Sequence, residues 1–222
     1  MSREPAAEQV PTVFVVDDEE SVLRMIGRML RSVALPVETF SSVTEFLKRC
    51  DPRRPGCLVL DVRMPGPSGL DLQEILEKKG IEIPIIFITG HGDVSMSVRA
   101  MKAGAVDFIE KPFHDQVLID AIRAALQRDA GIRRSAAARS DVLERWTSLT
   151  PREKEVLALV VKGRANKEIA AALGISERTI KLHRGNVMAK MRADSLADLV
   201  VLAQMAGVLP AGPPDPAGEM RH

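Results

Sequence analysis

Residues 57–69 read CLVLDVRMPGPSG, an unbroken apolar run that ends at Asp61 and is followed by a segment rich in proline and glycine. A short apolar run without alternating polar residues is typical of a β-strand buried on both faces of a parallel sheet. In such sheets the ligand sites lie just beyond the carboxyl ends of the strands. The stretch therefore favours an α/β fold and makes Asp61 the first candidate for a functional residue.

Similar apolar runs lie on both sides of this one and alternate with helical patterns. The other expected strands cover residues 12–16, 37–40, 84–88 and 106–109. Apolar residues with the spacing of an amphipathic helix follow the strands, over residues 22–30, 43–47, 69–79, 94–103 and 115–127. This alternation predicts a doubly wound, five-stranded parallel sheet over residues 11–128.

Chemically active side chains follow four of the five expected strands. Asp17 and Asp18 follow the first, and the others are Asp61, Thr89 and Lys111. Because the carboxyl ends of parallel strands meet at one edge, we expect these side chains to lie close together. Carboxylates gathered in this way repel one another unless a cation is present, and their hard oxygens suit Mg²⁺. The set predicts a site that carries a phosphoryl group on an aspartate.

The motifs FVVDDEE, LVLDVRMPGPSG, IPIIFITGHGD and MKAGAVDFIEKPF resemble the receiver domain of bacterial response regulators. They most resemble the FixJ branch of the NarL/FixJ (LuxR-type) group, over about residues 11–128. The resemblance implies that a sensor histidine kinase phosphorylates Asp61. It also implies a Mg²⁺ site formed by Asp18, Asp61 and the backbone carbonyl of Arg63, with Asp17 behind them or bridged to the ion by water.

The resemblance further implies how the phosphoryl group changes the domain. Thr89 and Lys111 are expected to contact the phosphoryl group, and Thr89 vacates a space that Phe108 then fills. Phe108 stands where many relatives have Tyr, and Gly90 where many have Ala, but both residues keep the steric role. The new charge, nearly two units, is expected to repack the face formed by residues 94–109 and to favour a homodimer.

Two other classes of protein were compared with this interpretation. A phosphatase of the haloacid-dehalogenase type needs a second Asp two residues after its nucleophile as general acid, and Arg63 occupies that position. We therefore expect no enzyme. The other alternative is a DNA-binding regulator whose receiver domain is only structural. The intact set of Asp18, Asp61, Thr89 and Lys111 argues against that alternative.

Composition limits the class of protein and its location. The chain has 222 residues, of which 45% are hydrophobic and 27% charged, as in ordinary globular proteins of one or two domains. No apolar run approaches the ~18–20 residues needed to cross a bilayer, and the N-terminus has no export signal. Cys50 and Cys57 lack metal-ligand spacing and are expected to be reduced. We expect a cytoplasmic protein without a membrane partner.

The formal net charge of +1 hides a difference between the two halves. Residues 1–128 carry 16 Lys and Arg against 19 Asp and Glu, whereas residues 162–192 carry 8 against 2. A basic second half fits a polyanionic partner. Residues 129–146 are rich in Ala and Arg with little apolar periodicity, which predicts a linker that is partly helical near its ends. Residues 210–222, rich in Pro and Gly, are predicted to be disordered.

The segment 147–209 has an all-helical pattern. Residues 150–153, TPRE, have the form of a capping box with proline at the first helical position. Helices are expected over residues 155–161, 166–173, 177–191 and 195–206. The second and third are joined by Leu173-Gly174-Ile175-Ser176, a spacing typical of a helix-turn-helix.

Polar residues on one side of this motif are the candidates for contact with DNA. Some project from the second helix of the motif, and others lie at helix N-termini, where backbone N–H groups can meet a phosphate. The set is Asn166, Lys167, Ser176, Arg178, Thr179, Lys181, Leu182, His183, Arg184 and Lys190. The alternative is a small helical bundle with a solvated basic face, and the Gly turn and the charge balance favour DNA.

This segment resembles the LuxR-type C-terminal domain over essentially its whole length. The resemblance implies that Lys181 and Leu182 face the major groove and that residues 195–206 supply a dimer contact. Gly185 stands where relatives have Lys, so one direct base contact is expected to be absent. Together the two resemblances predict a transcriptional regulator that binds promoter DNA as a homodimer on phosphorylation, as an activator acting through RNA polymerase.

Overall fold

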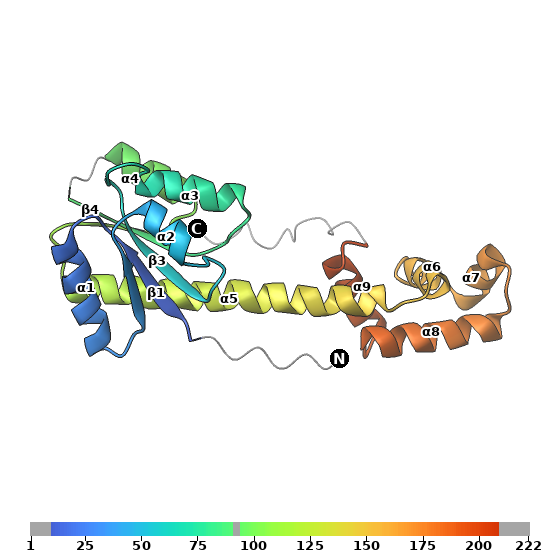
Figure 1. Ribbon diagram of the computed structural model, residues 1–222. Helices are drawn as coiled ribbons and strands as arrows, with labels where there is room; N and C mark the ends of the chain where they lie inside the picture. Colours follow the sequence, from blue (N-terminus) through green and yellow to red (C-terminus); the bar gives the residue numbers. More distant parts are fainter. Residues whose placement is uncertain (1–9, 91–93, 209–222) are drawn as a thin grey trace, which may run out of the picture. The chain divides into compact units, whose positions relative to one another are not determined.

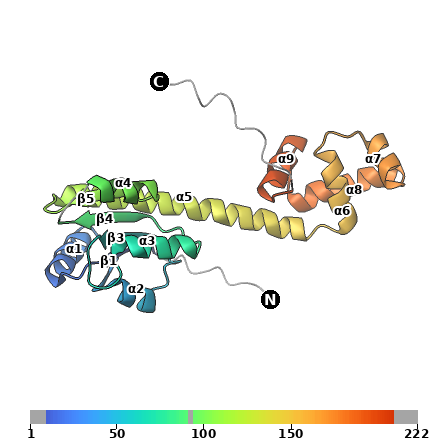
Figure 2. The same cartoon turned by 90° about the horizontal axis from the view of Figure 1, so that it is seen from above.

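The computed structural model describes residues 10–90 and 94–208. The chain forms two compact units, with the boundary between Arg133 and Arg134. Each unit has a hydrophobic core of its own, and each is described by itself (Figures 1 and 2).

The first unit is built on a five-stranded parallel sheet. Its strands are β1 (Thr12–Val16), β2 (Val37–Phe40), β3 (Gly56–Asp61), β4 (Ile85–Thr89) and β5 (Asp107–Glu110), in the order β2-β1-β3-β4-β5. Every residue of β1, β3 and β4 is buried, as expected for the central strands of a sheet covered on both faces. The predicted fold class is confirmed for this unit.

Helices cover both faces of the sheet. They are α1 (Glu20–Ser32), α2 (Val43–Arg49), α3 (Gly69–Lys78), α4 (Val94–Lys102) and α5 (Asp115–Thr147). One core cluster joins the sheet to α2, α3 and α4, and the other joins it to α1 and the first part of α5. Figure 1 shows α3 and α4 above the sheet, and α5 crossing the strands in the lower half of this unit.

The helix α5 differs from the prediction for the linker. Residues 129–146 were expected to be helical only near their ends, but α5 is continuous from Asp115 to Thr147. The segment 134–141 is exposed throughout and buries no apolar face. Its helix instead reflects the high intrinsic helix propensity of Ala and Arg, which the lack of apolar periodicity concealed.

The second unit is all-helical, as predicted. It contains α6 (Pro151–Val160), α7 (Asn166–Leu173), α8 (Glu177–Met191) and α9 (Leu196–Met205). Thr150 and Glu153 form the predicted capping box, and α6 begins at Pro151, the residue predicted as its first helical position. No helix in the described ranges is long and apolar enough to cross a membrane. The prediction for residues 210–222 lies outside the described residues.

Candidate functional sites

Lys111 lies between two buried carboxylates at the carboxyl edge of the sheet. Its Nζ atom is 2.7 Å from Oδ2 of Asp17 and 2.9 Å from Oδ1 of Asp61. Asp17 is completely buried, and Asp61 is 6% exposed. These residues stand at the ends of β5, β1 and β3, so the parallel topology brings together three side chains that are far apart in the sequence.

The remaining carboxylate oxygens are held by the backbone. Oδ1 of Asp17 accepts a hydrogen bond from the N–H of Glu19 (2.8 Å), and Oδ2 of Asp61 accepts one from the N–H of Arg63 (2.7 Å). Sequence reasoning missed Glu19, whose carboxylate lies 3.7 Å from Nζ of Lys111. The acidic run DDEE was the available signal. Since Glu19 is 62% exposed, its attraction for Lys111 is screened by water.

The charges of this site do not balance. Burial, the largest effect, raises the pKa of Asp17 above its ordinary value, against the hydrogen bond that it receives from Lys111. Burial alone would lower the pKa of Lys111, but its hydrogen bonds to Asp17 and Asp61 outweigh this and raise it. Two buried carboxylates therefore share one ammonium that stays protonated. The excess negative charge suits a further cation.

The donor set fits Mg²⁺ by charge and by atom type. Carboxylate oxygens can each accept more than one bond, so oxygens already bonded to Lys111 or the backbone keep acceptor capacity. Asp18 is exposed beside the buried pair. Within the described residues, however, no three His, Cys, Asp or Glu side chains are gathered into a metal site. A backbone carbonyl or water must complete the coordination.

Thr89 and Phe108 lie on the two strands beyond Asp61. Thr89 ends β4 and is 1% exposed, and its carbonyl accepts a hydrogen bond from the N–H of Lys111 (2.7 Å). Phe108 is half-buried on β5 next to Phe87, with 6.3 Å between the ring centroids. It also packs against the core cluster that includes Ala100 of α4. The expected switch residues are thus placed between the aspartate and α4.

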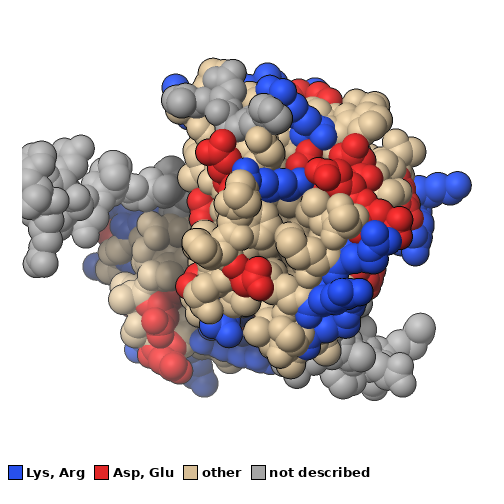
Figure 3. All heavy atoms as spheres, turned by 90° about the vertical axis from the view of Figure 1, so that its left-hand side faces the viewer, with Lys and Arg blue, Asp and Glu red and all other residues tan. Residues whose placement is uncertain are grey.

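The surface on the side of α1 carries both signs of charge. Figure 3 shows acidic and basic side chains close together on this side of the molecule. Exposed residues of this region include Asp18, Glu19, Arg24, Arg28 and Arg31. A surface of this kind favours a partner with a matching mixed pattern of charge over a polyanion such as DNA.

The second unit contains a helix-turn-helix formed by α7 and α8. Gly174 ends α7 with a φ of +67°, in the left-handed region that glycine adopts without strain. The Ser176 hydroxyl then caps α8 by accepting a hydrogen bond from the N–H of Thr179 (3.1 Å). Apolar residues bury the contact between the helices, among them Ile169, Ala170, Ile180 and Val187.

Six of the candidate DNA contacts are exposed. Lys190 is one of them, although it is also held by a contact within the unit, and the others are Lys167, Ser176, Arg178, Lys181 and Leu182. Leu182 is 63% exposed in the middle of this basic helix. A leucine in this position can make an apolar contact with the methyl group of thymine. Thr179 is half-buried under the cap of α8.

Lys190 and the other three candidates are held within the unit. Arg184 donates to the side-chain oxygen of Asn166 (2.7 Å), which joins α8 to the first residue of α7. His183 is half-buried, and its Nδ1 atom is enclosed without a hydrogen-bond partner in the described part of the chain. Lys190 donates to Oε2 of the buried Glu153 (2.7 Å). Lys190 therefore has a structural role that sequence reasoning missed.

Comparison with known proteins gives matches to both units. The family model described as "Response regulator receiver domain" matches residues 13–123, and "Bacterial regulatory proteins, luxR family" matches residues 147–203. The chain is 50% identical to Nodulation protein W of Bradyrhizobium diazoefficiens, over 88% of this chain and 86% of that protein. It is 48% identical to Transcriptional regulatory protein FixJ of Azorhizobium caulinodans, over 90% of this chain and 94% of that protein.

A solved structure matches nearly as much of the chain. The response regulator StyR gives a TM-score of 0.80 at 50% sequence identity, over 87% of this chain and 98% of that one. Both the fold of each unit and the order of the units along the chain therefore occur in known proteins.

Proposed function

Because the chain belongs to the two-component response regulators that join a receiver domain to a LuxR-type DNA-binding domain, we propose that a partner histidine kinase phosphorylates Asp61 and thereby promotes dimerisation and promoter binding. The family consists of transcription regulators related to FixJ and TodT, so this chain is a regulator and not an enzyme. We further propose that the protein acts in the cytoplasm and activates transcription through RNA polymerase.

The observation that carries this proposal is the contact of Lys111 with both Asp17 and Asp61. A carboxylate oxygen of Asp61 attacks the phosphorus of a phosphohistidine, the P–N bond breaks, and the imidazole leaves. Lys111 and the hydroxyl of Thr89 then bind the phosphoryl oxygens. Asp18, Asp61 and the carbonyl of Arg63 would hold Mg²⁺, with Asp17 behind them or bridged by water, and the ion would supply positive charge against the phosphoryl oxygens.

The proposed output surface is α4 and β5. Thr89 moves toward the phosphoryl group, and Phe108 fills the space that it leaves. Val98 and Met101 of α4 are each 46% exposed, and a dimer formed through this face would bury them. The change in charge at the aspartate thus becomes a change in packing, and the packing favours a homodimer.

The proposed DNA contacts divide into two kinds. Lys181 and Leu182 of α8 face base edges in the major groove. Residues at helix starts, such as Lys167 and Arg178, bind phosphates. Gly185 is exposed, and because it has no side chain we propose no base contact from this position. On α9, Leu196 and Val201 are 43% and 53% exposed and suit the proposed dimer contact.

The test compares wild type with Asp61→Asn after treatment with acetyl phosphate or a kinase. Wild type is expected to become labelled, dimerise and bind DNA more tightly, whereas Asp61→Asn should do none of these. Asp120→Asn is the matched control, since Asp120 is an exposed carboxylate on α5. Equal dimerisation and DNA binding in wild type and Asp61→Asn would instead indicate a phosphorylation-independent regulator.

A further inference from the structure

Two side chains of α5, Asp129 and Arg133, fasten this helix to the loop that precedes β3. Nε of Arg133 donates to Oδ2 of Asp129 (2.7 Å), and its two terminal nitrogens donate to the carbonyls of Arg53 (2.8 Å) and Arg54 (2.7 Å). Oδ2 of Asp129 also accepts from the N–H of Gly56 (3.0 Å). We call Asp129 and Arg133 the α5 clamp. Two carbonyls of the loop and the N–H of Gly56, the buried first residue of β3, obtain hydrogen-bond partners from it.

The two residues of the clamp depend on each other. Asp129 is 2% exposed, and its Oδ1 atom has no hydrogen-bond partner among the described residues. A buried carboxylate is unfavourable without a cation in contact with it, and Arg133 is that cation. Without Arg133, the carboxylate would keep the hydrogen bond from the N–H of Gly56 but no contact with Arg133. The clamp therefore joins a buried carboxylate, Asp129, to a guanidinium whose side chain is 35% exposed.

The loop that the clamp holds has a fixed position. Gly56, the first residue of β3, has a φ of +151°, and a Cβ there would lie 1.9 Å from the carbonyl oxygen of Thr12. Arg54 pairs with Glu38 of β2 (2.8 Å) and lies over the ring of Phe14. Since β3 begins at Gly56 and ends at Asp61, the clamp is attached to the strand that carries the proposed phosphoacceptor.

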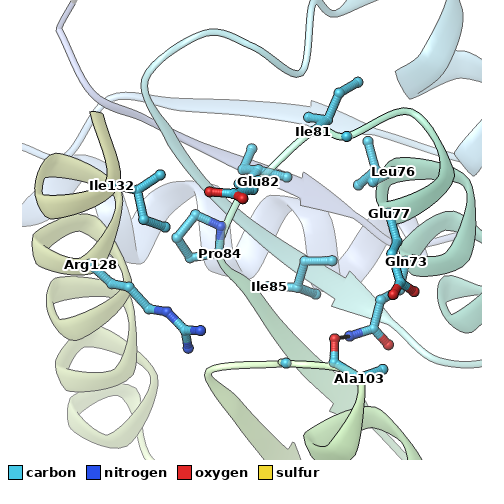
Figure 4. A pocket seen from close by; sticks show the side chains of 13 residues that line it. Gln73, Leu76, Glu77, Ile81, Glu82, Pro84, Ile85, Ala103, Arg128 and Ile132 are labelled. Atoms are coloured by element: carbon cyan, nitrogen blue, oxygen red, sulfur yellow. Dashed lines mark hydrogen bonds between the residues drawn. The ribbon is translucent and has the colours of Figure 1, made fainter. Parts of the chain in front are cut away.

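On its other side the same part of α5 is incompletely packed. Arg128 and Ile132 border a cleft of about 500 Å³, which is also lined by Pro84 and Ile85 at the start of β4 and by Gln73 of α3. Figure 4 shows Arg128 and Ile132 extending from α5 toward Pro84 across this cleft. Apolar packing thus holds this turn weakly on the cleft side, and the clamp supplies the polar contacts that hold it on the other.

Beyond the clamp the helix buries no side chain until it reaches the second unit. Residues 134–141 are all exposed, so their helical structure rests on intrinsic propensity, which is marginal for a short isolated segment. The described contacts of α5 with the receiver core therefore end at the clamp. Burial resumes only at Val142, in the core of the second unit.

We propose that the α5 clamp makes residues 128–133 a fixed extension of the receiver domain, and that Asp129 and Arg133 are positioning residues for control of the DNA-binding domain. This inference rests on the proposed phosphorylation of Asp61. The clamp fixes the start of the linker helix relative to β3. A rearrangement of the receiver domain therefore reaches the linker through this fixed end of the helix. Without the clamp, opening of the exposed segment spreads back into the receiver and weakens that control.

Hydrogen exchange in the full-length protein tests the anchoring directly. In wild type, amides of residues 128–133 should exchange slowly and those of residues 135–141 quickly. In Arg133→Gln, exchange over 128–133 should be at least about tenfold faster. Arg139→Gln, the same change at an exposed position of the same helix, should leave it unaltered. Equal protection of residues 128–133 in wild type and Arg133→Gln would overturn the anchoring.

A functional measurement separates positioning from mere stability. Arg133→Gln should be phosphorylated by acetyl phosphate at the wild-type rate but should lose most of the phosphorylation-dependent gain in DNA binding. If Arg133→Gln does not fold, the double variant Asp129→Asn/Arg133→Gln removes both buried charges and serves instead. A wild type without any response to phosphorylation would refute the proposed function. A responsive wild type with an equally responsive Arg133→Gln would refute the role of the clamp alone.

Discussion

Replacing Lys190 with Gln removes the cation that contacts a buried carboxylate in the helical unit. Lys190 Nζ lies 2.7 Å from Oε2 of Glu153 and 3.4 Å from the carbonyl oxygen of Ser148. Glu153 is 4% exposed and also accepts a hydrogen bond from the N–H of Thr150 (2.8 Å). The variant keeps the backbone contact of Glu153 but leaves its charge unpaired, so the unit should become less stable.

The size of the effect lies between two limits. Removal of one partner of a fully buried ion pair costs about 3–5 kcal/mol, whereas an exposed pair contributes about 0–1 kcal/mol. Glu153 is buried, but the side chain of Lys190 is 38% exposed, so water screens the cation. We therefore expect Lys190→Gln to lower the free energy of unfolding by about 2 kcal/mol, between these limits.

Trp146 provides the assay for this unit. It is the single tryptophan of the chain, and it packs against the core of the second unit. Urea unfolding followed by its fluorescence should have a slope of about 1 kcal/mol per M for a domain of this size. A loss of about 2 kcal/mol then moves the midpoint down by roughly 2 M. An unchanged midpoint in Lys190→Gln would refute the reasoning.

A matched variant and the pH dependence sharpen this test. Lys181→Gln makes the same change in charge at an exposed position of α8, and it should change the free energy of unfolding by less than about 0.5 kcal/mol. The hydrogen bond from Lys190, the largest effect, lowers the pKa of Glu153 below its ordinary value of 4.5. The pair therefore stabilises the unit above pH 4.5, and the stabilisation is lost as pH falls through the lowered pKa. The difference in the free energy of unfolding between wild type and Lys190→Gln should therefore become smaller as the pH falls through this range.

Three further substitutions address the other sites. Lys111→Met should leave the carboxylates beside Asp61 without their cation. The phosphorylation-dependent increase in DNA affinity should then fall at least about tenfold. Fluorescence anisotropy on DNA with and without acetyl phosphate measures this increase. Leu182 is 63% exposed, so Leu182→Ala should leave the free energy of unfolding within about 0.5 kcal/mol of wild type. The variant should nevertheless weaken specific DNA binding by about 1 kcal/mol. The same anisotropy titration on specific and unrelated DNA checks this. Gln73→Ala removes a buried side chain that donates to the carbonyls of Ala100 (3.3 Å) and Ala103 (3.0 Å) at the end of α4. It should therefore destabilise the receiver by about 1–2 kcal/mol. Hydrogen exchange over residues 95–103 equal to wild type would contradict this.

The receiver fold was predictable because its signals are local. Each central strand is a short apolar run that stops at a polar residue, and the helices between them have clear apolar faces. The linker was predicted less well for a physical reason. Residues 134–141 are exposed and bury no apolar side chain, so no periodicity marks them. Their helix depends on the propensities of Ala and Arg, a weaker signal than amphipathic spacing.

The carboxyl edge of the sheet was predictable from topology alone. Asp17, Asp61 and Lys111 are separated by dozens of residues, yet the rule that parallel strands end at one edge brings them together. The α5 clamp lies at the opposite end of β3 and follows no such rule. Its partners are backbone groups of a loop, which leave no trace in residue identity.

The same reasoning separates the basic residues of the helical unit by the groups that they contact. A Lys or Arg in a sequence indicates only that an anion lies nearby, and a folded protein supplies anions of its own. Lys190 finds its anion in Glu153, and Arg184 finds an acceptor in Asn166. Lys167 and Lys181 are exposed, and neither forms an ion pair within the described residues. Their charge remains available to a partner outside the chain, and a helix-turn-helix presents that charge where phosphates and base edges meet it.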